Sequence, residues 1–518
     1  MTILSFSFFL FAVILLLLYY LTPSKYRWIH LLIGSLVFYF YSSKWLIIFP
    51  ILSTIVIYII GRLIGKKNEE NAKIKDLEIA DDEKKILKEK NKTQKKRFVF
   101  IGVILCLMCL VFTKYAGFIL ENVNSFFKIF NPDANLTVSK LLIPLGISYY
   151  TLEAISYIVD VYRGKIPATK NILHLALYLL YFPKVIEGPI SRFNDLAKNF
   201  FEENKLDFKN ITIGLDLIMY GLFKKMLIAD RAGIFANSAF SSTTGGLTTL
   251  LAMVLYTVQI YAEFSGCIDI VRGVSYLFSV KLPTNFRQPF FSKSIQEFWQ
   301  RWHISLGAWI KEYVFFPISL SKMNTKVGKF CKEKLPAYLS KFITVAFPLF
   351  FVWIVNGIWH GASYKYVIYG MYYYLIMMLA LLLKPLTDKL LDKIKLKDGV
   401  LNTIRILRTI LIVVVGMTLF RANTLSQFGN IMASLFNHNT DALAHGLVII
   451  DFVILIVGNL LILIVSLLEE KKKISIENGF TSNPMCRALV YTFVLCSLVI
   501  FGIYGDGYDA SEFIYGAF

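Results

Sequence analysis

Charge is scarce in this sequence. Only 17% of its 518 residues are Asp, Glu, Lys or Arg, whereas about 25% are charged in a typical soluble domain. Apolar residues reach 56%, and the mean hydropathy is +0.59. This composition excludes disordered, collagen-like and coiled-coil chains.

The signatures of several functional classes are also missing. The six cysteines lie mostly inside or beside apolar segments, including a C-x-x-C at Cys106 and Cys109, so we predict packing residues and no disulfide framework. No two of the six histidines have metal-ligand spacing, and we predict no metal site. The phosphate-binding motif G-x-x-x-x-G-K-[ST] is absent, which argues against an ATP-driven pump.

Long apolar runs dominate what is present. Many approach or exceed the roughly 17–25 residues that a helix needs to cross a bilayer. We predict an all-α polytopic membrane protein with about eleven transmembrane helices, plus re-entrant and interfacial helices. The apolar segments are Ile3–Leu21, Ile29–Tyr41, Trp45–Ile60, Phe98–Leu120, Leu141–Tyr162, Leu173–Phe182, Ile211–Ile228, Leu247–Ala262, Phe342–Ile358, Tyr366–Leu383, Ile404–Phe420, Leu447–Leu468 and Ala488–Ile503.

Basic residues concentrate in short loops beside these segments, where Lys and Arg mark the cytoplasmic side. This placement explains the net charge of +20 without a nucleic-acid partner. The most polar stretch, Arg62–Arg97, holds 13 Lys or Arg and 8 Asp or Glu, and we predict a cytoplasmic solvated helix or disordered loop near anionic lipid. In a multi-pass protein of the cell membrane, this orientation predicts that the N-terminus and the C-terminus are extracytoplasmic.

The apolar segments within residues 141–262 are short and interrupted by Pro, Gly and charge. Irregular backbone survives at membrane depth only where protein or a watery cavity covers it, so we place the functional cavity here. The segment Tyr181–Arg192 holds two prolines and a glycine. We interpret it as a re-entrant turn whose Glu187 and Pro189 line a tunnel, with a simple cytoplasmic loop as the alternative.

His360 closes an apolar segment in the run Gly357–Ala362, where an ionisable side chain is costly and by default signals function. On a helix, Asn356 and His360 share one face with Trp353, and the glycines let another backbone or a substrate come close. Neutral imidazole, with a pKa near 6.5, can accept a hydroxyl proton. We predict a catalytic base at His360 with Asn356 and Trp359 lining its site. The alternative is a buried histidine that satisfies a backbone carbonyl.

His303 lies in Ser294–Tyr313, which reads as one helix with Trp302 on an aromatic side and Arg301 on a polar side. Tryptophan beside cations is typical of an interfacial helix at lipid headgroups. We expect His303 to sit on the cytoplasmic donor side, where Arg301 and Lys311 attract an anionic donor, and to affect the donor KM more than kcat. Trp302 and Arg301 are predicted to line the substrate path. A histidine that only packs is the alternative.

A series of motifs in order along the chain resembles the membrane-bound O-acyltransferase (MBOAT) family, and more closely its bacterial alginate O-acetyltransferase branch. The strongest are Glu-Phe-Trp-Gln-Arg-Trp-His-Ile-Ser-Leu at Glu297–Leu306 and Gly-Ile-Trp-His-Gly-Ala at Gly357–Ala362. The branch usually has Asp-Phe-Ser-Gly-Tyr at Glu263–Cys267 and Arg-Asp at Lys311 and Glu312, so the sign of each charge is kept. The other matching segments are Pro144–Tyr150, Asp160–Gly164, Phe182–Pro183, Glu187–Ile190, Gln259–Tyr261, Phe264–Gly266, Leu282–Phe286 and Leu419–Ala422.

The resemblance implies that His360 is catalytic, that His303 is a second important histidine, and that the spans surround a central tunnel. The implied reaction moves an acyl group, first of all acetyl, from a cytoplasmic thioester across the membrane for O-acylation of an extracellular or cell-wall polysaccharide. The donor would be acetyl-CoA or a group on a carrier protein, with no bound cofactor. An extracytoplasmic SGNH-hydrolase-like acyltransferase is the implied partner on the far side.

The resemblance also implies three parts. These are N-terminal transmembrane helices at 1–120 with the charged loop at 62–97, a catalytic core at 121–425, and C-terminal transmembrane helices at 426–518. The sequence leaves two alternative functions open. One is D-alanyl transfer to teichoic acid from a carrier-protein thioester, within the same family. The other, from a different class, is a transporter or lipid scramblase that uses the broken spans as its pathway.

Overall fold

The computed structural model describes residues 3–131, 143–202, 205–241, 245–394, 396–437, 445–476, 479, 481 and 483–504. Within these ranges the chain is helical, with no strand and one isolated bridge between Phe286 and Trp302. The all-α prediction is therefore confirmed. The chain divides into two compact units, Met1–Ile211 with Val274–Pro283 and Thr212–Gly273 with Thr284–Phe518.

Eight helical segments in the described part of the chain are long and apolar enough to cross a membrane. The predicted number of about eleven differs because some neighbouring spans run together and others are short. Ser24–Lys73 joins two predicted spans through a 3-10 turn, and the apolar helix Phe6–Leu21 has 16 residues. The eight are Ser24–Lys73, Asp81–Phe127, Gly246–Leu277, Ala337–His360, Tyr364–Ile394, Asp398–Arg421, Ile449–Glu470 and Pro484–Phe501.

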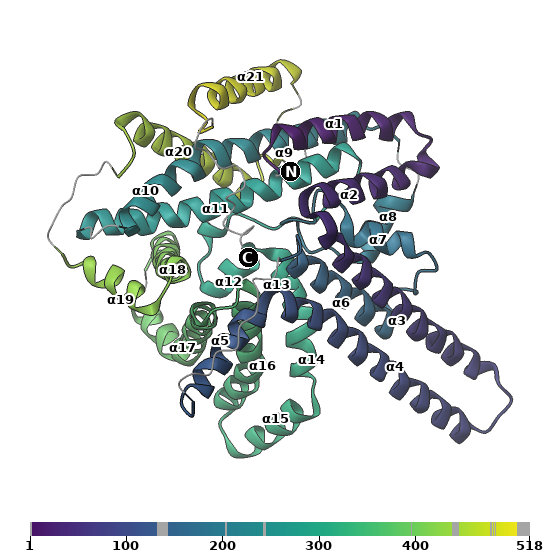
Figure 1. Ribbon diagram of the computed structural model, residues 1–518. Helices are drawn as coiled ribbons and strands as arrows, with labels where there is room; N and C mark the ends of the chain where they lie inside the picture. Colours follow the sequence, from purple (N-terminus) through teal and green to yellow (C-terminus); the bar gives the residue numbers. More distant parts are fainter. Residues whose placement is uncertain are drawn as a thin grey trace. The chain divides into compact units, whose positions relative to one another are not determined.

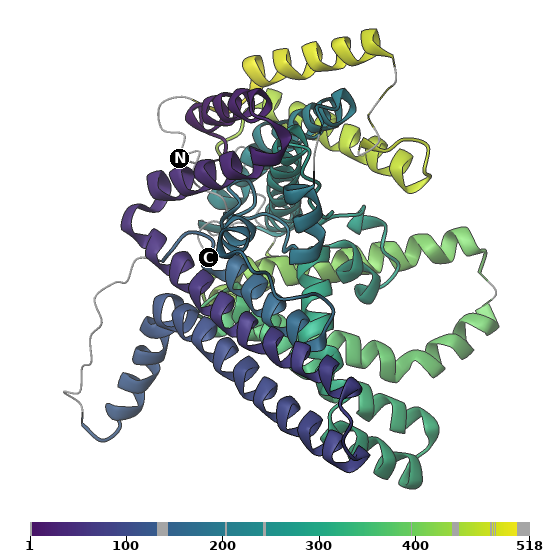
Figure 2. The same cartoon turned by 90° about the vertical axis from the view of Figure 1, so that its right-hand side faces the viewer.

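The first unit places a long helical hairpin against a buried helix. In Figures 1 and 2, α3 and α4 run side by side, and both pack against α6. The α-helices of this unit are α1 Phe6–Leu21, α2 Arg27–Ser43, α3 Ile48–Lys73, α4 Asp81–Leu110, α5 Ala116–Phe127, α6 Ile147–Arg163, α7 Ile172–Leu180 and α8 Phe193–Phe201.

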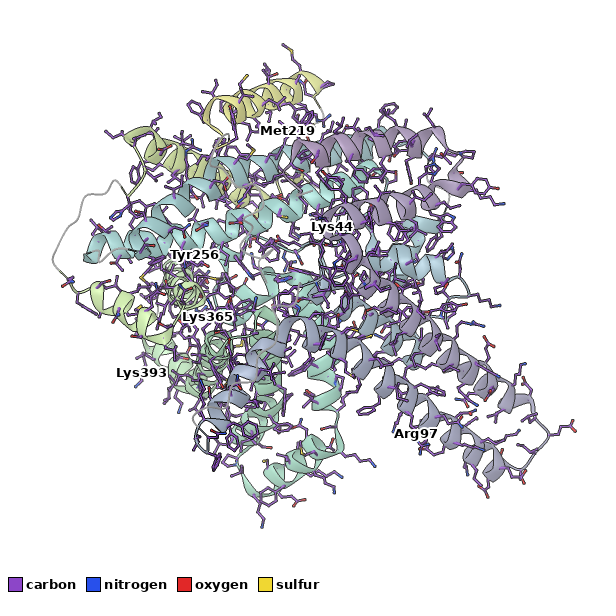
Figure 3. The ribbon with its side chains drawn as sticks, viewed as in Figure 1. Lys44, Arg97, Met219, Tyr256, Lys365 and Lys393 are labelled. Atoms are coloured by element: carbon purple, nitrogen blue, oxygen red, sulfur yellow. The ribbon has the colours of Figure 1, made fainter. Side chains whose placement is uncertain are left out.

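The charged stretch Arg62–Arg97 forms the polar end of this hairpin. It is helical apart from the connection between α3 and α4, so of the two predicted alternatives the helix is the one observed. Asn91 on α4 donates a hydrogen bond to Asn71 on α3 at 2.9 Å. Arg97, labelled in Figure 3, is the last charged residue before α4 becomes apolar. Local charge pairs and helix packing therefore order a stretch whose composition alone suits disorder.

We expect this polar hairpin end to face the cytoplasm, because its basic excess matches the side that retains Lys and Arg. Glu78 is exposed at the connection, so Glu78→Cys offers a reporter once the exposed Cys486 and Cys496 are replaced by Ser. A membrane-impermeant maleimide should label Glu78→Cys only after the cells are permeabilised. Labelling of intact cells would invert the proposed orientation and, with it, the side from which a donor arrives.

The second unit carries both of the histidines singled out above. Its helices α16 and α17 pack closely against each other, and α9 continues into α10 through a π-helical turn at Phe223–Ala229. Two of its α-helices, α9 Phe208–Leu222 and α11 Gly246–Leu277, each have one end in the first unit. The others are α10 Asp230–Ser241, α12 Ile295–Arg301, α13 Ile304–Ile310, α14 Phe316–Ser319, α15 Lys322–Lys334, α16 Ala337–His360, α17 Tyr364–Ile394, α18 Asp398–Arg421, α19 Leu425–Ser434, α20 Ile449–Glu470 and α21 Pro484–Phe501.

Candidate active site

His360 is the last residue of α16 and is only 3% exposed. Asn356 lies one turn earlier on the same helix and is 7% exposed. Within the residues that the structure describes, the Asn356 side-chain oxygen has no hydrogen-bond partner. The predicted helical face therefore exists, and it presents an imidazole and an amide oxygen to the protein interior.

Two glycines bring α17 close to this face. A Cβ atom at Gly357 would lie 2.3 Å from the carbonyl oxygen of Tyr366, and one at Gly370 would lie 2.3 Å from the carbonyl oxygen of Trp353. Only hydrogen fits in such gaps, so α16 and α17 can approach backbone to backbone. The prediction that another backbone approaches near Gly357 is confirmed, and the backbone is that of Tyr366.

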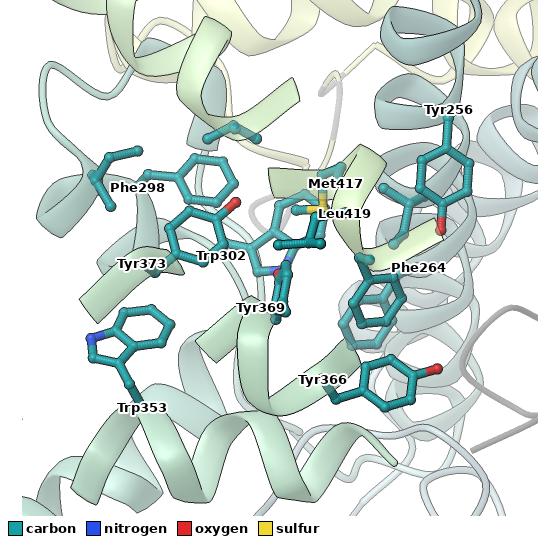
Figure 4. Close-up of a cluster of buried hydrophobic side chains, with 14 of the residues drawn as sticks. Tyr256, Phe264, Phe298, Trp302, Trp353, Tyr366, Tyr369, Tyr373, Met417 and Leu419 are labelled. Carbon is teal, nitrogen blue, oxygen red and sulfur yellow. The ribbon is translucent and has the colours of Figure 1, made fainter. Parts of the chain in front are cut away.

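Aromatic rings from α17 and α18 pack around His360. The ring centroids of Tyr369 and Phe420 lie 5.7 Å and 5.2 Å from the imidazole, both nearly perpendicular to it. Figure 4 shows Tyr366 and Tyr369 within the larger cluster of buried aromatic and apolar side chains to which Trp302 also belongs. An apolar surrounding of this kind excludes water from the imidazole.

The predicted single helix across Ser294–Tyr313 is wrong. The structure ends α12 at Arg301 and starts α13 at Ile304. Between them Trp302 is extended, with φ −110° and ψ 131°, and His303 is left-handed, with φ 47° and ψ 51°. The break arises because Trp302 forms a bridge with Phe286.

The break turns His303 into the protein, where it is 3% exposed. The centroid of its ring lies 4.9 Å from that of Phe264 and 5.5 Å from that of Trp359. The ring centroids of Trp359 and His360 are 5.1 Å apart. Trp359 therefore contacts both histidines, and the structure brings together the residues that the sequence separated by more than fifty positions.

The burial of His303 also sets its protonation state. Desolvation lowers its pKa to about 3, because a charged imidazole is poorly solvated in such a site. His303 is therefore neutral at physiological pH. Neither of its ring nitrogens has a hydrogen-bond partner among the described residues, so a neutral imidazole here has one unpaired N–H donor and one unpaired acceptor nitrogen.

The exposed aromatic face expected of an interfacial helix is absent from this segment. Trp302 is 1% exposed and Trp309 5% exposed, so both side chains pack inside the protein. Arg301 does not present an open cation, because it donates to Glu470 at 2.8 Å and 3.0 Å and to Glu297 at 2.7 Å. The ion pairs of Arg301 leave Lys311, which is exposed, as the other cation expected on the donor side, and the donor-side role of this segment stays a prediction.

Glu187 and Pro189 lie in the first unit, within a non-helical buried segment. The predicted break of the helix at Tyr181–Arg192 is confirmed, since α7 ends at Leu180 and α8 begins at Phe193. Glu187 is 1% exposed. Its role in lining a tunnel stays a prediction.

Buried ion pairs are the feature that the sequence analysis missed. Lys225 contacts Asp230 at 2.8 Å and Glu263 at 3.4 Å, and all three side chains are less than 10% exposed. Lys224 likewise contacts Asp269 at 2.6 Å. The sequence did offer a signal for these pairs, because charged residues inside apolar runs usually pair with one another. In the described ranges no group of three or more His, Cys, Asp or Glu side chains could hold a metal.

The comparison with known proteins identifies the family. A family model described as MBOAT, membrane-bound O-acyltransferase family, matches residues 163–419, a range that contains both His303 and His360. The chain is 32% identical over 438 residues to the probable alginate O-acetylase AlgI of Pseudomonas aeruginosa, a match covering 83% of this chain and 74% of that protein. The chain belongs to the membrane-bound O-acyltransferase family. It is an acyltransferase, and a multi-pass membrane protein.

Two other relatives are named as transferases for peptidoglycan and for teichoic acid. The peptidoglycan O-acetyltransferase of Helicobacter pylori is 30% identical over 305 residues, which are 54% of this chain and 54% of that protein. The teichoic acid D-alanyltransferase of Bacillus subtilis is 28% identical over 293 residues, which are 54% of this chain and 67% of that protein. The similarity to the alginate O-acetylase branch thus extends over more of this MBOAT chain.

Proposed function

We propose that this MBOAT protein transfers acetyl groups from a cytoplasmic thioester across the membrane for O-acetylation of an extracellular or cell-wall polysaccharide. The observation that carries the proposal is the pair of buried histidines on either side of Trp359. Similarity over 83% of the chain to a probable alginate O-acetylase supports acetyl as the group transferred. Acetyl-CoA, or an acetyl group on a carrier protein, is the proposed donor.

In the proposed reaction His360 acts as the general base. The acceptor hydroxyl oxygen attacks the thioester carbonyl carbon while His360 accepts the hydroxyl proton. The C–S bond then breaks, and the leaving thiolate takes a proton from the His360 imidazolium, so charge and protons balance. Attack by a histidine nitrogen itself, giving an acyl-histidine, is the covalent alternative. Neutral His303 would donate or accept one hydrogen bond at the reacting group.

The aromatic cluster would serve this chemistry by excluding water. A thioester is lost to hydrolysis if water reaches its carbonyl carbon during transfer, and a closed apolar site prevents that side reaction. We further propose that the spans surround a tunnel lined in part by Glu187 and Pro189. An extracytoplasmic SGNH-hydrolase-like acyltransferase would complete the transfer to the polymer.

Ester analysis of the surface polymer tests the function. Mild alkali should release acetate from cells that carry the gene, little acetate after its deletion, and the original amount after complementation. Loss of D-alanine instead of acetate would assign the protein to D-alanyl transfer. Unchanged esters of both kinds in the deletion strain would contradict acyl transfer to the polymer and favour transport or lipid scrambling.

A further inference from the structure

Left-handed backbone flanks the Phe286–Trp302 bridge on both of its segments. His303 follows Trp302 and has φ 47°, and Gln288 lies two residues after Phe286 and has φ 40°. Left-handed backbone is unfavourable for residues other than glycine, and it persists only where surrounding contacts impose it. The bridge itself supplies two backbone hydrogen bonds, Arg287 N–H to Arg301 at 2.9 Å and Ile304 N–H to Asn285 at 3.0 Å.

Two carboxylates at the end of α20 form hydrogen bonds to residues on both segments of this bridge. Glu469 accepts a hydrogen bond from the Gln288 side chain at 2.6 Å. Glu470 accepts two from the Arg301 guanidinium, at 2.8 Å and 3.0 Å. Paired, charge-assisted bonds of this kind fix orientation as well as distance. Two consecutive carboxylates therefore restrain one residue on each of the two segments that form the bridge.

A third contact closes the arrangement. The Arg301 guanidinium also lies 3.4 Å from the backbone oxygen of Gln288 and donates to Glu297 at 2.7 Å. Arg301 thus connects α12, the strained Gln288 and the end of α20. Glu469 and Glu470 lie beyond residues 163–419, the range that the family model matches.

We propose that Glu469 and Glu470 are positioning residues for the acyl-transfer site, which restrain Gln288 and Arg301 and thereby hold the His303 imidazole against Phe264 and Trp359. This inference rests on the proposed role of His303 at the reacting group. It gives α20, which follows both histidines in the sequence by more than eighty residues, a part in their site. A small displacement of a site residue can lower kcat about 100-fold.

Steady-state kinetics on the purified full-length protein tests the positioning role. Glu470→Ala should lower kcat about 10–100-fold, while the donor KM changes less than about threefold and the thermal midpoint stays near that of the wild type, because a partly exposed ion pair contributes little stability. Glu470→Gln keeps one acceptor oxygen and should recover part of kcat. Glu469→Ala should act in the same direction by releasing Gln288.

A double-mutant cycle shows whether Glu470 acts through Arg301. If it does, Arg301→Gln combined with Glu470→Ala should be no worse than the more damaging single variant. Lys471→Gln removes a charge from the same exposed end of α20 and serves as the matched control, with wild-type kcat expected. Arg301→Lys keeps the charge but loses the forked geometry, so its kcat should fall between wild type and Arg301→Gln.

Two results separate failure of this inference from failure of the proposed function. Wild-type kcat in Glu469→Ala and Glu470→Ala, with His303→Gln inactive in the same assay, would overturn the positioning role alone. Equal losses of folded protein and of activity in the two glutamate variants would overturn it too, since the carboxylates would then serve folding only. Wild-type kcat in His303→Gln would remove the catalytic premise.

Discussion

Replacing His360 with alanine should lower the rate of acyl transfer about 10²–10⁴-fold, the usual effect of removing a general base. The protein should still fold, because the rings that contact the imidazole, Tyr369 and Phe420, belong to a larger buried cluster that does not include His360. The measurement is acetyl transfer by purified variant and wild type at matched concentration, with membrane abundance and thermal midpoint recorded for both.

His174→Ala is the matched control for this substitution. His174 stacks on Phe201 with ring centroids 3.7 Å apart, in the first unit, and has no proposed part in the reaction. Its loss should leave the rate within about threefold of wild type, as for most substitutions away from a site. A His360→Ala rate within a few-fold of wild type would refute the assignment of the base, whatever the control shows.

Helical periodicity was sufficient to predict the face that carries Asn356 and His360. Both lie on α16, a 24-residue helix whose apolar run is read directly from the sequence. Periodicity could not predict which residues pack against that face. Phe420 and Tyr369 come from α18 and α17, and a sequence pattern does not specify which helices cross. The glycine spacing indicated a close approach without identifying the neighbour.

The break at Trp302 and His303 had only a weak local signal. His is among the residue types that enter left-handed backbone more often than most, but the aromatic spacing fits a continuous helix. Tertiary contacts decide the conformation instead, through the bridge to Phe286 and the contact of Arg301 with Glu470. The pattern indicates an exposed aromatic face, but in the structure Phe298 and Trp302 pack in the buried cluster instead.

The partners of buried charges could not be predicted from the sequence either. Tyr181–Arg192 was correctly predicted to be irregular, because two prolines and a glycine interrupt it. The partner of its Lys184 could not be predicted, since Glu153 lies on α6 and is reached only through the tertiary fold. A cation at membrane depth requires such a partner.

Replacing Lys184 with methionine should destabilise the protein by about 3–5 kcal/mol, the effect of leaving one member of a buried ion pair unpaired. Lys184 donates to Glu153, and the two side chains are 2% and 3% exposed. The other carboxylate oxygen accepts from the Ser191 backbone N–H at 2.9 Å, which cannot offset the lost cation. Denaturant titration in mixed micelles measures the free energy of unfolding.

Two further variants make this result specific. Lys184→Met with Glu153→Gln removes both charges but keeps an acceptor for Ser191, so it should recover most of the lost stability. Lys85→Met is the matched control, because Lys85 and its partner Asp82 are 78% and 89% exposed, and such a pair is worth less than about 1 kcal/mol. Equal stability losses in Lys184→Met and Lys85→Met, or a double variant less stable than Lys184→Met, would show that charge pairing does not hold this turn against α6.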